Sequence, residues 1–239
     1  SMKMTRSLGA ENADVASSLN SLGRIAARAG KLEEAEALMR EGLALRRKLF
    51  APEHPAIAGS LTSLGSALQK RGDLAASEAA HREALAIYRK AYGPSHRSVA
   101  TALNNLAAIE SLRGRLPEAE SLYRDALALR RQALGGSHPD LVKSLARLAD
   151  VLLRSGKPAE AEPLAREALA MQRTLTGAKP LDEAVLLGML GEAVARQERF
   201  SEAEPLLLQS WEIQSTNRGT SRRDQRLTLR QLADLYEAW

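Results

Sequence analysis

Apolar residues recur along the whole chain at a fixed offset of 42 residues, and within each period they follow helical spacing. In the first half of the first period, Val15, Leu19, Leu22 and Ala26 are three or four residues apart, which places them on one face of a helix. A second run, from residue 32 to about residue 50, has the same spacing. The pattern therefore predicts a pair of amphipathic helices in each period and no β-strand.

The offset holds for several kinds of residue. Two leucines of the first helix recur six times, as Leu19, Leu61, Leu103, Leu145, Leu187 and Leu229 and as Leu22, Leu64, Leu106, Leu148, Leu190 and Leu232. A glycine, which tolerates the left-handed conformation after a helix end, closes the first helix of four periods, at Gly30, Gly72, Gly114 and Gly156. Because a two-helix unit cannot bury its apolar face alone, we expect the units to stack into an all-α solenoid.

The repeat also predicts the domain organisation. We expect a single solenoid domain over residues 13–239, with a capping helix at about 222–238. Its five repeats are expected at about 13–53, 54–95, 96–137, 138–179 and 180–218. Residues 1–12 are interpreted as a tag remnant at Ser1 followed by a lead-in to the first helix.

Composition restricts the class of function. The 239 residues include no cysteine, which excludes disulfides, thiolate zinc sites and cysteine nucleophiles. No stretch approaches the roughly 18 apolar residues of a membrane span, and the N-terminus lacks the apolar core of a secretory signal. We therefore expect a cytoplasmic protein without a membrane partner.

The residues that carry catalysis or bind metals do not form a recognisable motif. There is no phosphate loop, no nucleophile–base pairing and no His-Glu-x-x-His signature. His54, His96 and His138 recur at the repeat offset, so they lie at least the roughly 8–10 Å of a helix packing distance apart and cannot share a zinc ion. We predict turn residues at these three positions, a packed His81, and a non-enzymatic protein with no cofactor, metal or small-molecule substrate.

Three motifs together resemble the tetratricopeptide-repeat family: Leu-x-x-Leu-Gly/Ala in the first helix, the closing glycine, and Ala-Glu-x-Leu at the start of the second helix. The 42-residue period and the Gly-x-x-His-Pro turn at 135–139 resemble the kinesin-light-chain type. The resemblance implies a right-handed superhelix whose first helices line a concave groove for extended peptides. The chain departs from the pattern at Glu198, which replaces the closing glycine. The usual aromatic residue of the first helix is also replaced, by Ala26, Leu68, Glu110, Leu152 and Val194.

If the family geometry applies, one stripe of the first helices faces this groove. The stripe has seven basic and three acidic residues, in a protein whose formal net charge is +5. The basic residues are Arg24, Arg28, Lys70, Lys143, Arg154, Arg196 and Arg230, and the acidic residues are Asp150, Glu192 and Asp234. We expect the stripe to bind a protein or peptide segment that is acidic or C-terminal, with particular dependence on Arg28, Lys70, Arg154 and Arg196. The candidate ligand-binding residues are Asn20, Arg24, Arg28, Lys70, Asn104, Leu112, Lys143, Arg154 and Arg196.

Other interpretations of the charged residues stay open. The stripe can be a solvated helix face. The second-helix arginines Arg40, Arg82, Arg124 and Arg166 each follow a glutamate by four residues, which favours structural ion pairs. A further row, Arg47, Arg89, Arg131 and Arg173, could contact nucleic acid, but without accompanying aromatic residues this partner is disfavoured. Self-assembly, including a homo-oligomer, is the remaining alternative, and it predicts an exposed apolar patch at Leu207, Trp211 and Trp239.

Overall fold

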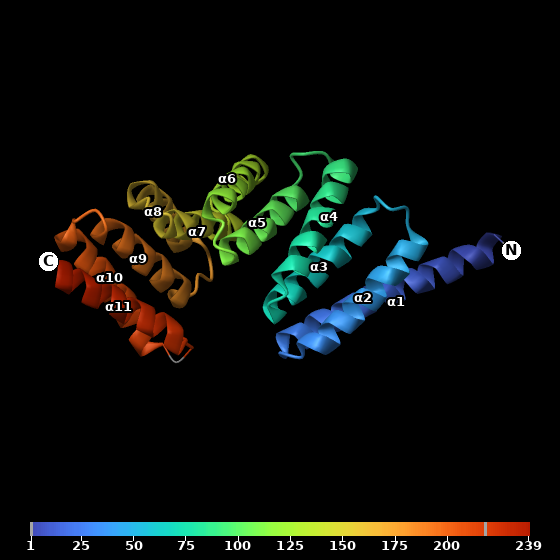
Figure 1. The fold of residues 1–239 in the computed structure, drawn as a ribbon, viewed down its shortest axis with the longest axis horizontal. Helices are drawn as coiled ribbons and strands as arrows, with labels where there is room; N and C mark the ends of the chain where they lie inside the picture. The colour runs from blue at the N-terminus through green and yellow to red at the C-terminus, as the bar shows by residue number, and fades with distance from the viewer. Residues whose placement is uncertain (1, 218) are drawn as a thin grey trace. The chain divides into compact units, whose positions relative to one another are not determined.

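The computed structural model describes residues 2–217 and 219–239, with side chains from residue 12 onward, and over these ranges it contains eleven helices and no strand. The helices are α1 (Met2–Arg28), α2 (Leu32–Leu49), α3 (Pro55–Arg71), α4 (Leu74–Tyr92), α5 (Arg97–Leu112), α6 (Leu116–Ala133), α7 (Pro139–Arg154), α8 (Pro158–Thr174), α9 (Pro180–Ala195), α10 (Phe200–Thr216) and α11 (Arg222–Ala238) (Figure 1). The predicted all-α series of helix pairs is confirmed.

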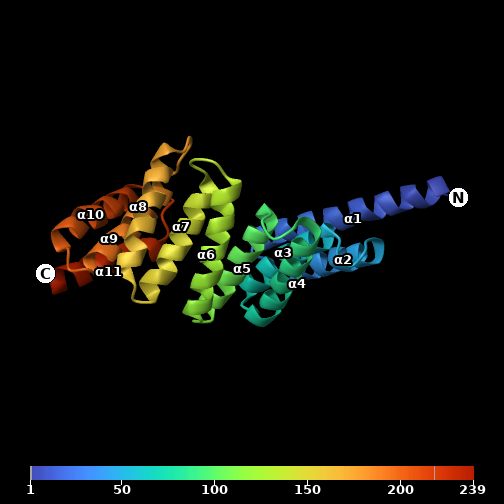
Figure 2. The same cartoon turned by 90° about the horizontal axis from the view of Figure 1, so that it is seen from above.

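The chain forms two compact units, one ending at Arg115 and the other beginning at Leu116. In the first unit α1 packs along α2 and α3 along α4, while α2 also contacts α3 and α4 contacts α5. In the second unit the pairs α7/α8 and α9/α10 lie side by side, as Figure 2 shows, with α6 against α7 and α11 against α10. Within each unit a second helix therefore packs between its own first helix and the next one.

The repeated histidines begin the first helices. His54 and His96 accept a hydrogen bond through Nδ1 from the backbone N–H two residues later, both at 3.2 Å. His138 does the same at 3.0 Å. Since the first N–H groups of a helix have no partner within the helix, these side chains cap the helices that follow. The prediction that all three are turn residues is confirmed.

The glycine that closes the first helix has a left-handed backbone, with φ of 90° at Gly72. Glu198 occupies the same position in repeat five and has φ of 61° there. A side chain at positive φ is strained because its Cβ crowds the neighbouring backbone. Repeat five thus keeps the turn of the other repeats in spite of its sequence.

The repeated leucines of the first helices are buried wherever a preceding repeat is present. Leu64, Leu106, Leu148 and Leu190 are each at most 4% exposed, whereas Leu22 at the same repeat position is 53% exposed. The difference follows from connectivity, because in the described chain no second helix precedes α1. The repeat position therefore predicts burial only where a preceding helix is present.

Two buried carboxylates replace apolar packing in the first unit. Glu110 occupies the position where the family has an aromatic residue, and it is 4% exposed. Its carboxylate forms an ion pair with Arg115 and lies 3.9 Å from Arg82. Glu78 forms ion pairs with the same two arginines and with Arg113. A buried carboxylate is tolerated when it is paired and hydrogen-bonded, so we interpret this cluster as structural.

Candidate functional site

A hollow of about 200 Å³ lies between α1 and α3 in the first unit, on the stripe that the sequence singles out. Arg24 and Arg28 from α1 and Lys70 from α3 line it, and all three side chains are exposed. The hydroxyl residues Thr62, Ser63 and Ser66 complete its polar lining, and no carboxylate lines it. Two helices one repeat apart thus place three cations around one hollow.

None of these three cations has an ion-pair or hydrogen-bond partner in the described part of the chain. Cations without a neighbouring carboxylate keep their full attraction for an incoming anion. Arginine can also hold a carboxylate through two parallel hydrogen bonds. The hollow is therefore suited to a carboxylate-bearing segment.

The two candidate asparagines lie deeper. The Asn20 Nδ2 donates to Ser63 Oγ at 3.4 Å, which links α1 to α3 beside the hollow. Asn104 on α5 is 8% exposed. The Oδ1 atoms of both are buried and lack a partner among the described residues. Asn20 is therefore next to the hollow, whereas Asn104 is covered.

The cations of the second unit differ from those of the first because each has a carboxylate nearby. Arg196 is 2.5 Å from Glu192, and it also donates to the Leu153 carbonyl at 2.7 Å. Arg154 is 3.7 Å from Asp150. Lys143 and Arg230 lie 3.8 Å from Asp140 and 3.9 Å from Asp234 respectively. In this unit the stripe is a series of ion pairs, and Arg196 also has a structural bond.

The remaining candidate, Leu112, lies at the end of α5 and is 57% exposed. Its role as an apolar contact for a ligand stays a prediction. It does not line the hollow between α1 and α3.

A second hollow, of about 480 Å³, lies between α9 and α11 in the second unit, and the sequence did not predict it. Its lining combines apolar side chains with charges of both signs, among them Phe200, Leu227, Glu192, Arg230 and Asp234. The apolar residue Leu227, among the polar residues at the start of α11, was the available signal in the sequence. Because its charges are balanced, this hollow favours no particular ligand charge.

The second-helix arginines form the predicted structural pairs. Arg40, Arg124 and Arg166 lie 2.8, 2.9 and 2.7 Å from the glutamates four residues before them, and Arg82 pairs with Glu78. The other arginine row is largely paired too, since Arg47, Arg131 and Arg173 each bind a glutamate at 2.6–2.8 Å. The charges of these arginines are therefore largely neutralised by neighbouring glutamates at the surface.

Four further features bear on catalysis, membrane insertion and self-assembly: metal-ligand groups, apolar helices, His81 and the C-terminal apolar residues. Within the described ranges no group of three side chains could hold a metal ion, and no helix is long and apolar enough to cross a bilayer. His81 is fully buried, and burial lowers the pKa of its imidazole to about 4. At the C-terminal end Leu207 is fully buried, whereas Trp239 is 59% exposed and stacks near Phe200 with ring centroids 6.3 Å apart. The predicted patch at Leu207, Trp211 and Trp239 is therefore not formed, which corrects that expectation.

Stacked helix pairs with a repeating core define the class of helical-repeat scaffolds. The sequence matches the model of the tetratricopeptide repeat at residues 14–90, 56–132 and 98–174, and a second model of that repeat at 146–218. The chain therefore belongs to the tetratricopeptide-repeat family. Proteins built from these repeats are generally non-enzymatic scaffolds for other proteins.

Solved structures agree with this assignment. The chain is similar to a crystal structure of nearly identical TPR-like repeats of a putative kinesin light chain from Podosopora anserina, with 25% identity, a TM-score of 0.74, and coverage of 87% of this chain and 99% of that one. It also resembles BtubC (BKLC) from P. vanneervenii, with 21% identity, a TM-score of 0.79, and coverage of 92% and 89%. PilF of Pseudomonas aeruginosa shares 18% identity with a TM-score of 0.66, covering 95% and 87%. The last two show the fold alone. No curated protein matches the sequence.

Proposed function

We propose that this protein is a non-enzymatic adaptor that binds an acidic segment of a partner protein at the hollow between α1 and α3. The observation that carries the proposal is the set of three cations, Arg24, Arg28 and Lys70, which line one hollow and have no partner in the described chain. An acidic side chain or a terminal carboxylate of an extended segment provides the complementary charge. The proposal places the adaptor in the cytoplasm, on the sequence grounds given above.

The existing ion pairs of the second unit favour the first unit as the binding centre. A ligand carboxylate that approaches Arg196 competes with Glu192 and must disturb the bond to Leu153. Arg154 is likewise beside Asp150. Breaking an existing pair offsets part of the gain from a new one, so these cations contribute less to affinity than cations without a neighbouring carboxylate do. Arg154 and Arg196 remain proposed ligand contacts of secondary weight.

A selection from a peptide library tests the ligand class. The library displays random segments both internally and at a free C-terminus, and the full chain is the bait at about 0.15 M salt. We expect the selected peptides to be enriched in Asp and Glu around one apolar residue. Selection of basic or uncharged peptides would contradict the proposal.

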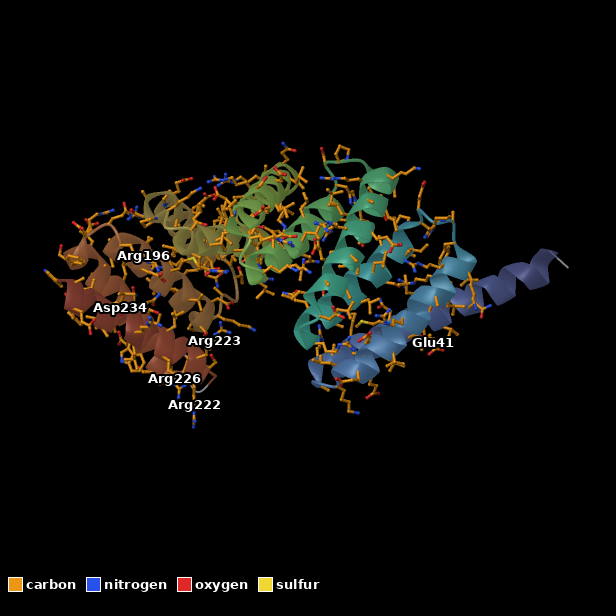
Figure 3. All side chains as sticks on the ribbon, in the orientation of Figure 1. Glu41, Arg196, Arg222, Arg223, Arg226 and Asp234 are labelled. Carbon is orange, nitrogen blue, oxygen red and sulfur yellow. The ribbon has the colours of Figure 1, made fainter. Side chains whose placement is uncertain are left out.

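Matched charge reversals test the location. Arg24→Glu with Lys70→Glu should weaken the selected acidic peptides by more than tenfold. The control is Arg222→Glu with Arg223→Glu, which makes the same change in net charge at exposed positions on α11 (Figure 3). If both double variants lose affinity equally, the attraction is a property of net charge and not of the hollow.

A further inference from the structure

The first repeat has an apolar face that no described element covers. Val15, Leu22 and Ile25 on α1 are 49%, 53% and 62% exposed. They share one helix face, because they are separated by seven and three residues. At the same repeat positions in repeat four, the side chains are all at most 4% exposed, namely Leu141, Leu148 and Val151. The face thus has the composition of an interface inside this array but is open.

Repeat four shows what occupies such a face. There α7, the helix that carries this face, packs against α6, the second helix of the preceding repeat. Polar contacts surround the apolar residues: Glu120 with Lys157 at 2.9 Å, Arg124 with Glu160 at 2.6 Å, Arg131 with Glu167 at 2.6 Å, and Arg130 with the Asp140 carbonyl at 3.1 Å. These contacts fix which charges of the helix meet which charges of the face.

Repeat one has the same receiving residues three repeats earlier. Five residues of repeat one have the same type and repeat position as their counterparts in repeat four. They are Lys31, Glu34, Glu41, Asp14 and Ser18, which match Lys157, Glu160, Glu167, Asp140 and Ser144 in that order. Lys31 and Glu34 are exposed and pair with each other at 3.2 Å. Glu41 is exposed on α2, is labelled in Figure 3, and has no partner among the described side chains. The apolar residues and the charges therefore match the same kind of helix.

We propose that this surface, the repeat-one open face, docks an amphipathic helix of a partner protein with the chemistry of α6. The open face consists of Val15, Leu22, Ile25, Lys31, Glu34 and Glu41. Such a helix has a glutamate, an arginine four residues later and a second arginine eleven residues after the glutamate, around an apolar stripe. The glutamate meets Lys31, and the two arginines meet Glu34 and Glu41. The apolar residues supply the affinity, and the ion pairs at the rim set the register and orientation.

The second helices of another copy of this chain are poor donors of such a helix. Each second helix of the chain carries such a stripe, but within each unit it already packs against the next first helix: α2 on α3, α4 on α5, α6 on α7, α8 on α9 and α10 on α11. A second copy would have to open its own array to donate one. A free amphipathic helix on a partner protein has no such requirement.

Titration with a helical peptide tests the proposal. The probe is a labelled peptide with the sequence of residues 115–135, held helical by a lactam bridge on its solvent side, and it is added to the full chain. We expect saturable binding that Leu22→Asp or Ile25→Asp weakens at least tenfold. Leu208→Asp, at a residue of α10 that is 44% exposed, is the matched control and should bind as the wild type does.

A charge exchange tests the predicted register. Glu41→Arg should weaken the peptide several-fold, and a peptide in which Arg131 is changed to Glu should recover that loss with the Glu41→Arg protein only. No saturable binding to the wild type, or binding that is unaffected by both aspartate variants, would overturn the proposal. Arg24→Glu with Lys70→Glu should leave this binding intact, so the outcome is independent of the acidic-segment site.

Discussion

His81 on α4 is a buried base that packs directly against Gly65 on α3. A Cβ atom at Gly65 would lie 2.7 Å from His81 Nε2, so only glycine fits opposite the ring. Both ring nitrogens are buried without a hydrogen-bond partner among the described residues. Desolvation disfavours the charged imidazolium, which lowers the pKa of His81 from 6.5 to about 4.

This shift predicts acid sensitivity. Between pH 6.5 and pH 4 the unfolded chain binds a proton at this residue and the folded chain does not, so stability is complete above pH 6.5 and falls as the pH approaches 4. The loss attributable to His81 is about 3 kcal/mol at one pKa unit per 1.36 kcal/mol. Denaturant midpoints measured across this range should fall less steeply for His81→Met, because methionine fills the same repeat position at Met39. Identical slopes for both proteins would show that His81 is not buried as described.

Substitution of Glu198 is expected to raise the stability of the protein. Its backbone lies at φ of 61°, and glycine adopts this region without the Cβ clash. Glu198→Gly should therefore raise the free energy of unfolding by about 1 kcal/mol, the typical cost of a left-handed L-residue. Thermal or denaturant melting measures it, with Glu237→Gly on the exposed end of α11 as a control that should not stabilise. A loss of stability in Glu198→Gly would indicate that the glutamate side chain has a compensating contact.

At the scale of the element, one leucine position has two environments. Leu106 is 4% exposed on α5, whereas Leu22 at the equivalent place on α1 is 53% exposed. Leu106→Ala should cost roughly 2–5 kcal/mol, as truncation of a buried leucine does. Leu22→Ala should change stability by less than about 0.5 kcal/mol. Equal costs for the two variants, measured by denaturant unfolding, would contradict the assignment of the open face.

The helix pairs were predictable because their signals are local and repeated. The 42-residue offset, the closing glycines and the turn histidines each depend on a few neighbouring residues, and all were confirmed. Ion pairing across helices is different, since it depends on the rotamers of long side chains. The sequence stripe shows Arg28 and Arg196 at one position, and only the structure distinguishes the unpaired side chain from the paired one. The burial of Asn104 was missed for a similar reason, because an asparagine on a polar stripe gives no signal of what covers it.

At the scale of the whole molecule, the net charge of +5 permits a nucleic-acid partner without requiring one. In the row that was considered for nucleic acid, Arg47, Arg131 and Arg173 each bind a glutamate, so few arginines remain for phosphates. We expect only weak association that falls steeply with salt, by roughly 10³–10⁵ between 50 and 200 mM if six to ten phosphates were contacted. Anisotropy with labelled single- and double-stranded oligonucleotides measures it. A sub-micromolar dissociation constant at physiological salt would reverse this ranking.

We propose above that Arg24, Arg28 and Lys70, which have no partner in the described chain, bind an acidic segment. The most direct measurement is the dissociation constant of a selected acidic peptide for three proteins: the wild type, Arg24→Glu with Lys70→Glu, and Arg154→Glu with Arg196→Glu. Circular dichroism melting of each protein confirms that the fold is retained. We predict a loss of more than tenfold for the first pair of substitutions and a smaller loss for the second, whose cations are already paired. Unchanged affinity in the Arg24→Glu, Lys70→Glu protein would contradict the account.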